Sequence, residues 1–271
     1  MPAGAMIAGP RVDAALAGRH AVVTGASRGI GAAAATSLAR LGAKVTLMAR
    51  DETTLAKRIA EMEPSASLRV QAVAIDVTDP EGVAGAFARA ANRFGPAHIL
   101  VNNAGVAAAA PFNKTDLQMW QKLIDVDLTG AFLCIRQVLS GMIAAGFGRV
   151  INVSSTAGLT GYSYIAAYCA AKHGLIGLTR ALAQETARTG VTVNAVCPGY
   201  TDTEIVATAL DNIVSKTGRS REQALQELVA HNPQGRLVTP EEVAEAIGWL
   251  SLPSSAAITG QSIVVAGGEL M

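Results

Sequence analysis

Seven short apolar runs recur along this chain, and longer stretches with helical patterning follow most of them. The runs occupy residues 21–24, 44–49, 70–75, 98–102, 149–153, 191–196 and 262–265. Several are apolar on both faces, which is typical of strands in a parallel sheet that helices cover on both sides. Helical patterning occupies residues 30–41, 52–62, 80–93, 116–145, 164–188 and a stretch that begins near Pro240. The alternation predicts right-handed crossovers and an α/β fold, a single doubly wound Rossmann-type domain with a seven-stranded parallel sheet and helices on both faces.

Two segments depart from this alternation. Residues 1–18 are rich in small side chains, and we expect a flexible extension there, before a single domain that spans residues 19–271. Residues 203–238 follow the sixth apolar run and carry aliphatic residues at helical spacing. An insertion of this length is more often a lid or a substrate-binding segment than a plain connection. Its basic residues Lys216, Arg219 and Arg221 could meet phosphates of a substrate, or they could be solvated surface charges.

The composition narrows the classes of function. Half of the 271 residues are apolar and 16% are charged, so the chain can bury a large core and is not a disordered protein. The 22 basic residues nearly balance the 21 acidic ones, which gives no electrostatic reason to expect a nucleic acid or an anionic membrane as partner. Three separated cysteines without a C-x-x-C pair indicate neither a metal site nor a disulfide framework. With no long apolar run and no signal-peptide pattern, we expect a cytoplasmic protein.

A glycine-rich segment lies where the first apolar run meets the first helix. It reads Thr24-Gly25-Ala26-Ser27-Arg28-Gly29-Ile30-Gly31. Gly25 can turn the chain tightly, Gly29 lets the backbone approach a pyrophosphate, and Gly31 allows the helix to pack on the strand. The free N–H groups and the dipole of a helix N-terminus favour a phosphate at this point. The segment therefore predicts a dinucleotide site, with a tight turn required by packing as the alternative.

The choice of cofactor depends on the residues near the end of the second apolar run. An acid there would bind the ribose hydroxyls of NAD, whereas an arginine would accommodate the 2′-phosphate of NADP. The run ends at Ala49-Arg50, and Arg28 in the glycine-rich segment is a second candidate cation. Together they favour NADP(H), with NAD(H) still possible if both arginines are solvated surface charges. Asp76, at the end of the third run, is placed to meet the adenine ring.

Tyr168 and Lys172 are four residues apart and so share one face of a predicted helix. A tyrosine hydroxyl normally titrates near 10. A nearby ammonium stabilises the phenolate and lowers that pKa, which makes tyrosine usable as an acid or base near neutrality. Ser155, just after the fifth apolar run, could hold a carbonyl oxygen in place. A Y-x-x-x-K spacing by itself is common by chance.

Taken together, these residues resemble the short-chain dehydrogenase/reductase family over residues 16–268. Five motifs in family order carry the resemblance: Thr24-Gly25-x-x-x-Gly29-x-Gly31, Asn102-Asn103-Ala104-Gly105, Ser155, Tyr168-x-x-x-Lys172 and Pro198-Gly199. A closer likeness, to 3-oxoacyl thioester reductases and aromatic-polyketide ketoreductases, rests on Leu128-Thr129-Gly130, Lys172-His173-Gly174 and the residues 193–199. The likeness implies an oxidoreductase that transfers a hydride between NADP(H) and a ketone or secondary alcohol, here a 3-oxoacyl thioester or similar β-dicarbonyl compound.

The resemblance also implies a role for each matched residue. Tyr168 would be the proton donor, Lys172 would bind the nicotinamide ribose, and Ser155 would hydrogen-bond the substrate oxygen. Asn102, Ala104 and Gly105 would line the adenosine half of the cofactor, while Thr201 and Thr203 would meet its carboxamide and phosphate side. The further expected cofactor contacts are Ser27, Ile30, Val77, Pro198 and Gly199. Assembly as a homotetramer or homodimer is implied too, through the long helices 116–145 and 164–188.

Two other interpretations of the function stay open on these residues. One is an NAD-dependent alcohol or 3-hydroxyacyl-CoA dehydrogenase that works in the oxidative direction. The other is a dinucleotide-binding regulator without catalysis, although the intact Ser155, Tyr168 and Lys172 argue against it.

The sequence departs from the family pattern at two positions. Where the family's catalytic tetrad has an asparagine that holds a relay water, this chain has Asp127, within Asp125-Val126-Asp127-Leu128-Thr129-Gly130. An ionised aspartate accepts hydrogen bonds but cannot donate one, which puts the relay in doubt. We expect Asp127 to lie beside Lys172 and to be tolerated. The second departure is Ala266, which replaces the acid that often precedes the family's glycine pair.

Overall fold

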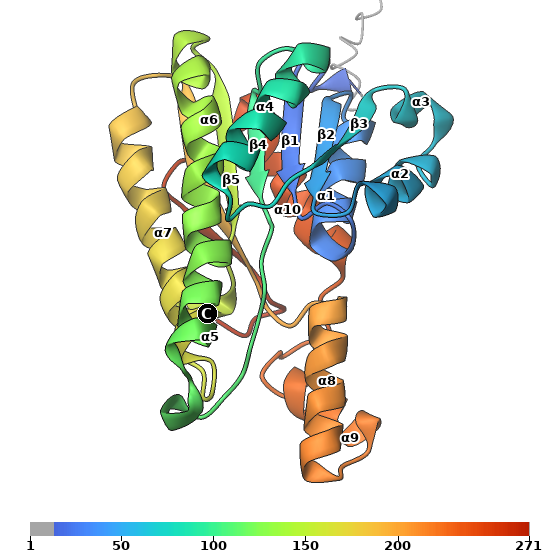
Figure 1. Ribbon diagram of the computed structural model, residues 1–271, viewed down its shortest axis with the longest axis vertical. Coiled ribbons are helices and arrows are strands. Elements are labelled where there is room, and N and C mark those ends of the chain that lie inside the picture. Colours follow the sequence, from blue (N-terminus) through green and yellow to red (C-terminus); the bar gives the residue numbers. More distant parts are fainter. Residues whose placement is uncertain (1–13, 271) are drawn as a thin grey trace, which may run out of the picture.

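The computed structural model describes residues 14–270, and its centre is one parallel sheet of seven strands (Figure 1). The strand order is β3-β2-β1-β4-β5-β6-β7, so the order reverses between β1 and β4. The strands are β1 (His20–Thr24), β2 (Lys44–Ala49), β3 (Val70–Ala74), β4 (Ile99–Asn102), β5 (Gly148–Val153), β6 (Val191–Pro198) and β7 (Ser262–Val265). The predicted doubly wound α/β fold is confirmed.

Helices cover both faces of the sheet, and successive side chains of one strand enter different cores. Ala21 and Val23 of β1 belong to the core under α1 (Gly29–Arg40) and α10 (Pro240–Ser251). Val22, between them, belongs to the core under α4 (Pro80–Phe94) and α6 (Gly130–Ala144). α7 (Ala166–Thr186) covers β6 on the α6 side. The short helices α2 (Glu52–Ala60) and α3 (Pro64–Ser67) connect β2 to the edge strand β3.

The long helix expected at residues 116–145 consists of three segments in continuous succession. These are α5 (Leu117–Ile124), a π-helical turn η3 (Asp125–Thr129) and α6. π-Helical turns occur mostly inside α-helices and often at functional sites. Asp127 lies in this turn and is buried. The stretch Leu117–Ala144 is long and apolar enough to cross a membrane by length and composition alone, a test that core helices also pass, and here α6 packs on β4 and β5.

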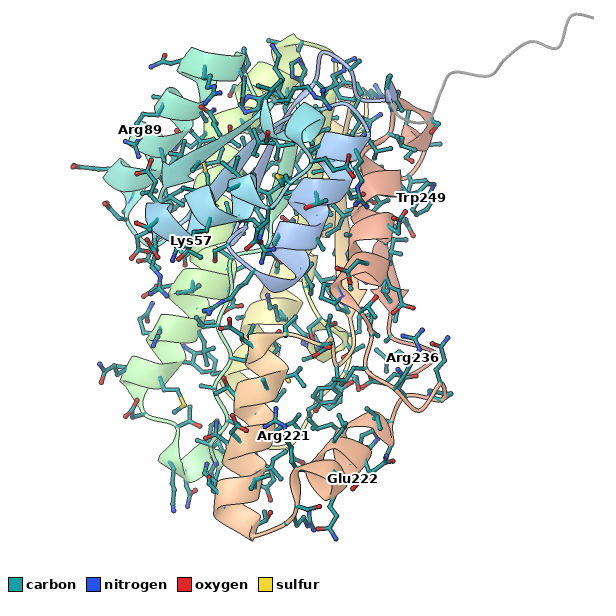
Figure 2. All side chains as sticks on the ribbon, turned by 90° about the vertical axis from the view of Figure 1, so that its right-hand side faces the viewer. Lys57, Arg89, Arg221, Glu222, Arg236 and Trp249 are labelled. Atoms are coloured by element: carbon teal, nitrogen blue, oxygen red, sulfur yellow. The ribbon has the colours of Figure 1, made fainter. Side chains whose placement is uncertain are left out.

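The insertion at residues 203–238 forms two helices, α8 (Glu204–Thr217) and α9 (Arg221–Val229), which extend past the end of the sheet (Figures 1 and 2). They pack on each other through a small cluster that includes Val206, Leu210 and Ala224. We call α8 and α9 the arm. Arg219 pairs with Glu227, and Arg221 pairs with Asp211, so two of the three basic residues considered as phosphate ligands are already paired with carboxylates next to them.

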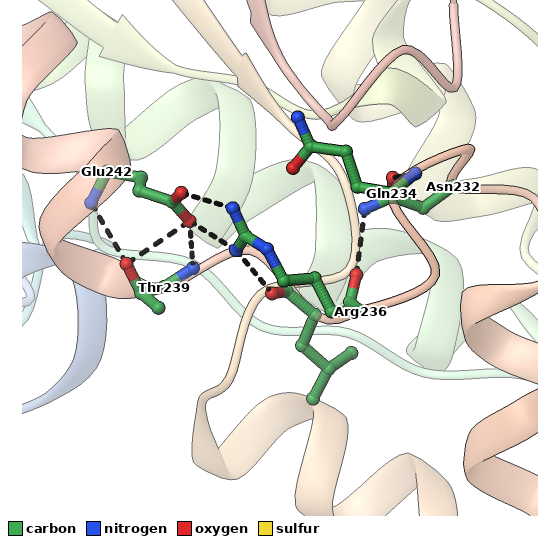
Figure 3. Close-up of polar contacts among 6 residues, drawn as sticks. Asn232, Gln234, Arg236, Thr239 and Glu242 are labelled. Carbon is green, nitrogen blue, oxygen red and sulfur yellow. Dashed lines mark hydrogen bonds and ion pairs between the residues drawn. The ribbon is translucent and has the colours of Figure 1, made fainter.

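Polar contacts fix the point where the chain leaves the arm for α10 (Figure 3). Thr239 and Glu242 form a capping box at the start of α10, and Glu242 also pairs with Arg236. Asn232 donates to the Arg236 carbonyl at 2.8 Å and accepts from the Gln234 N–H at 2.8 Å. This compact turn joins the arm to the main body of the protein.

The expected extension at residues 1–18 lies largely outside the described residues. Its last part is folded, which moves the domain boundary. Leu16 is fully buried in the core beneath α1, and its N–H donates to the Leu41 carbonyl at 2.8 Å. Residues 14–18 therefore belong to the domain, because burying a leucine side chain is favourable.

Candidate active site

The glycine-rich turn between β1 and α1 has a backbone that only glycine fits. Gly25 and Gly29 have φ values of +64° and +53°. A Cβ on Gly25 would lie 2.8 Å from Asn103 Nδ2, and one on Gly31 would overlap the Gly25 carbonyl oxygen. Arg28 precedes α1, and its side chain makes no capping hydrogen bond to the first turn of the helix. The backbone N–H groups of that turn are therefore free to bind another acceptor. A pyrophosphate group fits this cradle.

An open cleft of 2180 Å³ runs from this turn along the ends of β2, β3 and β4. It brings together most of the residues predicted to bind a cofactor. Those that line it are Gly25, Ser27, Arg28, Gly29, Ile30, Arg50, Asp76, Val77, Ala104, Gly105 and Thr203. Their spread along the sheet's carboxyl edge suits a ligand as long as a dinucleotide.

Six of the predicted cofactor residues lie outside the lining of the cleft, and two of these, Tyr168 and Lys172, belong to the catalytic group described below. Asn102 is buried in the sheet and donates to Asn152 at 2.9 Å, so its side chain supports β4 and β5 instead. Thr201 is buried and donates to the Gly199 carbonyl at 3.0 Å. Pro198 is the last residue of β6, and Gly199 follows it. Their predicted roles in cofactor binding remain predictions.

The two arginines predicted to select NADP differ in their surroundings. Arg28 forms an exposed ion pair with Glu204, the first residue of α8. Arg50 follows β2 at the surface of the cleft and lies near Asp76. Hydrogen bonds from Thr78, and then the charge of Arg50, lower the pKa of Asp76. A 2′-phosphate would therefore find Arg50 available and would compete with Glu204 for Arg28.

Ser155, Tyr168 and Lys172 come together at the end of β5. Ser155 caps a short helical turn, where its Oγ accepts from the Ala157 N–H at 3.1 Å. Ser155 is also close enough to Tyr168 to lower the pKa of the tyrosine. Lys172 Nζ lies 5.5 Å from the centroid of the Tyr168 ring, one turn further along α7. The predicted triad is thus assembled, with Tyr168 between a hydroxyl and an ammonium.

Asp127 lies directly beside Lys172. Its Oδ1 is 3.0 Å from Lys172 Nζ, and its Oδ2 accepts from the Val106 N–H at 3.2 Å. Lys172 also donates to the Val153 carbonyl at 3.1 Å. Both charged side chains are almost fully buried, and a Cβ on Gly105 would lie 2.8 Å from Asp127 Oδ1. The position predicted for Asp127 is correct, and the carboxylate makes a direct ion pair there.

This ion pair changes the acid–base properties expected of the site. Burial opposes the charged form of Lys172, but Asp127 and Tyr168 outweigh it and raise the pKa of the lysine. Burial raises the pKa of Tyr168 and Asp127 raises it further, while Lys172 and Ser155 lower it, and the net change is upward. Lys172 acts on the pKa of Tyr168 in the expected downward direction, but desolvation of the phenolate opposes it and has the larger effect. That Tyr168 works as an acid or base near neutrality remains a prediction.

Three further residues lie near the triad although the sequence motifs do not include them. Tyr162 donates a hydrogen bond to Glu269, and Tyr200 follows Gly199 at the end of β6. Burial raises the pKa of both tyrosines, and Glu269 adds to the rise. The positions of the tyrosines next to the catalytic motifs could have signalled them. Nothing in the sequence indicates that Glu269, near the end of the chain, returns to this site.

Comparisons with known proteins agree with this geometry. The short chain dehydrogenase family matches residues 19–213. The chain is 43% identical to a cis-4-hydroxycyclohexanecarboxylate dehydrogenase of Sinomonas cyclohexanicum, over 94% of this chain and 97% of that protein. It is 38% identical to a 3-oxoacyl-(acyl-carrier-protein) reductase of Vibrio cholerae, over 94% and 99%.

A solved structure of a single-residue variant of actinorhodin polyketide ketoreductase with NADPH superimposes with a TM-score of 0.89. It is 38% identical, and the match covers 93% of this chain and 97% of that one. With the cradle, the cleft and the Ser155–Tyr168–Lys172 group in place, these matches identify the chain as an oxidoreductase of the short-chain dehydrogenase/reductase family.

Proposed function

We propose that this protein reduces the ketone of a 3-oxoacyl thioester, or of a similar β-dicarbonyl compound, with NADPH. The observation that carries the proposal is the assembled group of Ser155, Tyr168 and Lys172 beside a dinucleotide-sized cleft. The names of the Vibrio cholerae relative and of the actinorhodin ketoreductase support the direction and the substrate class.

Each catalytic side chain has one task in this proposal. Bound NADPH would supply the hydride that adds to the carbonyl carbon. Ser155 holds the carbonyl oxygen, and Tyr168 gives that oxygen its proton. Lys172, held in the ammonium form by Asp127, stabilises the tyrosinate that remains. Because the pKa of Tyr168 is raised, the phenol carries the proton at neutral pH and is ready for the reductive direction.

The finer cofactor preference is also part of the proposal. Arg50 is placed to meet a 2′-phosphate, and charge-assisted contacts to phosphate are among the stronger polar interactions. NADPH should therefore bind more tightly than NADH. Ala104, Gly105, Val77 and Asp76 would contact the adenosine half, from the ends of β3 and β4.

The test is consumption of NADPH by the purified protein with acetoacetyl-CoA. We expect turnover that the Tyr168→Phe variant loses by roughly 10²–10⁴-fold, the usual contribution of general acid catalysis. A panel of ketones and alcohols with both cofactors separates the alternatives. Faster oxidation of 3-hydroxyacyl-CoA with NAD would favour the oxidative dehydrogenase, and tight cofactor binding without turnover of any carbonyl compound would favour the regulator.

We further propose that the protein is cytoplasmic and assembles as a homotetramer or homodimer through α6 and α7. Phe132 and Ile143 are large apolar side chains of α6 that stay exposed in the single chain. A two-fold interface would place this face against its own copy. Light scattering at micromolar concentration tests the proposal, and a particle of the 27.7 kDa chain mass would contradict it.

A further inference from the structure

Glu269 lies beyond the last strand, and a tight turn fixes its position. Gly267 and Gly268 have φ values of +61° and +93°, and the Glu269 N–H donates to the Ala266 carbonyl at 3.2 Å. A Cβ on Gly267 would overlap Asn232 Oδ1, and one on Gly268 would lie 3.3 Å from Pro233. The turn therefore packs closely against the base of the arm, and it directs Glu269 back toward the sheet.

The carboxylate of Glu269 has two neighbours, one in the loop before α7 and one directly after β6. Its Oε1 accepts a hydrogen bond from the Tyr162 hydroxyl. Its Oε2 lies close to the end of β6, since a Cβ on Gly199 would be 2.7 Å from it. Glu269 is half-buried, and its hydrogen-bond donor among the described residues is a neutral phenol. The negative charge is thus turned inward.

Two tyrosines connect this charge with the reacting group. Tyr162 lies in the loop that joins η4 (Thr156–Gly158), the short helical turn capped by Ser155, to α7, which carries Tyr168. Tyr200 is close enough to both Glu269 and Tyr168 that each of them raises its pKa, after burial, which has the largest effect. The Glu269 carboxylate therefore borders the space that a substrate must enter to place its carbonyl oxygen between Ser155 and Tyr168.

We propose that Glu269 is a specificity-determining residue, which disfavours 3-oxo acids, whose free carboxylate lies one carbon from the ketone, and so selects their neutral esters and thioesters. This inference rests on the proposed ketone reduction. A 3-oxo acid brings its negative charge within a few bonds of the reacting carbon, into a half-buried region where screening by water is reduced. The thioester of the same acid is neutral at that point. Discrimination by repulsion against the wrong substrate is a common route to specificity.

The experiment compares methyl acetoacetate with acetoacetate, which differ in charge at the same position. For the wild type with NADPH we expect the kcat/KM ratio to favour the ester. In Glu269→Gln the ratio should fall by about fivefold or more, the size expected for two like charges separated by several ångströms. The gain should lie mainly in a lower KM for acetoacetate. Glu269→Asp keeps the charge and should keep the discrimination, while Glu63→Gln, an exposed residue before α3, serves as the control.

Binding of both compounds to the protein–NADP⁺ complex provides a second readout, independent of turnover. The ester-to-acid ratio of Kd should shift in Glu269→Gln as the kinetic ratio does. Equal ratios in the wild type and Glu269→Gln would overturn the role of Glu269, whether or not the protein turns over either compound. A shift in the binding ratio without any turnover would support Glu269 and contradict only the proposed reduction.

Discussion

Replacing Asp127 with asparagine tests how the buried ion pair controls Tyr168. The substitution keeps the shape of the side chain and removes its charge. Asp127 Oδ1 lies 3.0 Å from Lys172 Nζ, and Nζ lies 5.5 Å from the centroid of the Tyr168 ring. The carboxylate oxygen is therefore at most 8.5 Å from the ring centroid. At that separation two unit charges repel by about 2 kcal/mol for an effective dielectric constant of 20.

Removal of the carboxylate should therefore favour the phenolate of Tyr168. Part of the gain is lost, because Lys172 gives up the partner that raises its pKa. In the oxidative direction, which needs the phenolate as base, we expect Asp127→Asn to raise the rate about three- to tenfold at pH values below the Tyr168 titration. In the reductive direction near neutral pH, the phenol is protonated in both proteins, and the rate should change by less than about tenfold, or about 1.4 kcal/mol.

The assay is a pair of pH–rate profiles, reductive and oxidative, at saturating cofactor. Asp125→Asn is the matched control, because Asp125 lies in the same π-helical turn and accepts a bond from Gln121 at 2.8 Å. An oxidative profile that stays in place, or that moves to higher pH, would refute the assignment of charge repulsion to Asp127. A loss of reduction as complete as in Tyr168→Phe would make Asp127 a primary catalytic group.

Other parts of the molecule can be tested in the same way. Arg50→Gln should weaken NADPH binding by more than it weakens NADH binding, in fluorescence titrations, and equal affinities of the wild type for both cofactors would contradict this. Burial lowers the pKa of His20, so the folded protein disfavours protonation of this side chain. The free energy of unfolding, measured by denaturant titration, should therefore fall as the pH drops below about 6.5. The His20→Gln substitution should reduce this loss of stability, and substitution of the exposed His231 with glutamine should not. Neutralising Lys216, Arg219 and Arg221 together should raise KM for a CoA thioester by less than about threefold, because Arg219 and Arg221 are already paired with carboxylates. A larger increase that is restricted to the CoA substrate would show that these residues bind its phosphates.

The sheet and its phosphate cradle could be predicted because they depend on local patterns. β1 and β2 are apolar on both faces, which is enough to identify central parallel strands. The φ values of Gly25 and Gly29 explain why glycine stands at those positions. Leu16 was assigned to an extension because one leucine among small residues gives no periodic signal. Leu16 packs in a core formed by residues that are distant in sequence, and its N–H bonds to the Leu41 carbonyl.

Side-chain direction and net electrostatics could not be predicted from motifs. Asn102 belongs to a family motif, yet its side-chain amide donates a hydrogen bond to Asn152 on the neighbouring strand β5. Arg28 has the right chemistry for a phosphate, but Glu204 at the start of the arm reaches it. The pKa of Tyr168 depends on burial and on two opposite charges at once. Spacing in the sequence specifies which groups meet and leaves open which of these effects is larger.

The protonation state in which Tyr168 meets a substrate follows from that balance. A reductase needs its tyrosine protonated when the ketone arrives, and burial together with Asp127 maintains that state. Lys172 must then stabilise the phenolate that forms after proton transfer, so it has to stay charged while buried. Asp127 raises the lysine pKa through the ion pair and the Val153 carbonyl accepts a second bond, which together offset the desolvation of the ammonium. Asp127 thus favours the protonated form of Tyr168 before the proton transfer and the charged form of Lys172 after it. Both effects suit reduction better than oxidation at neutral pH.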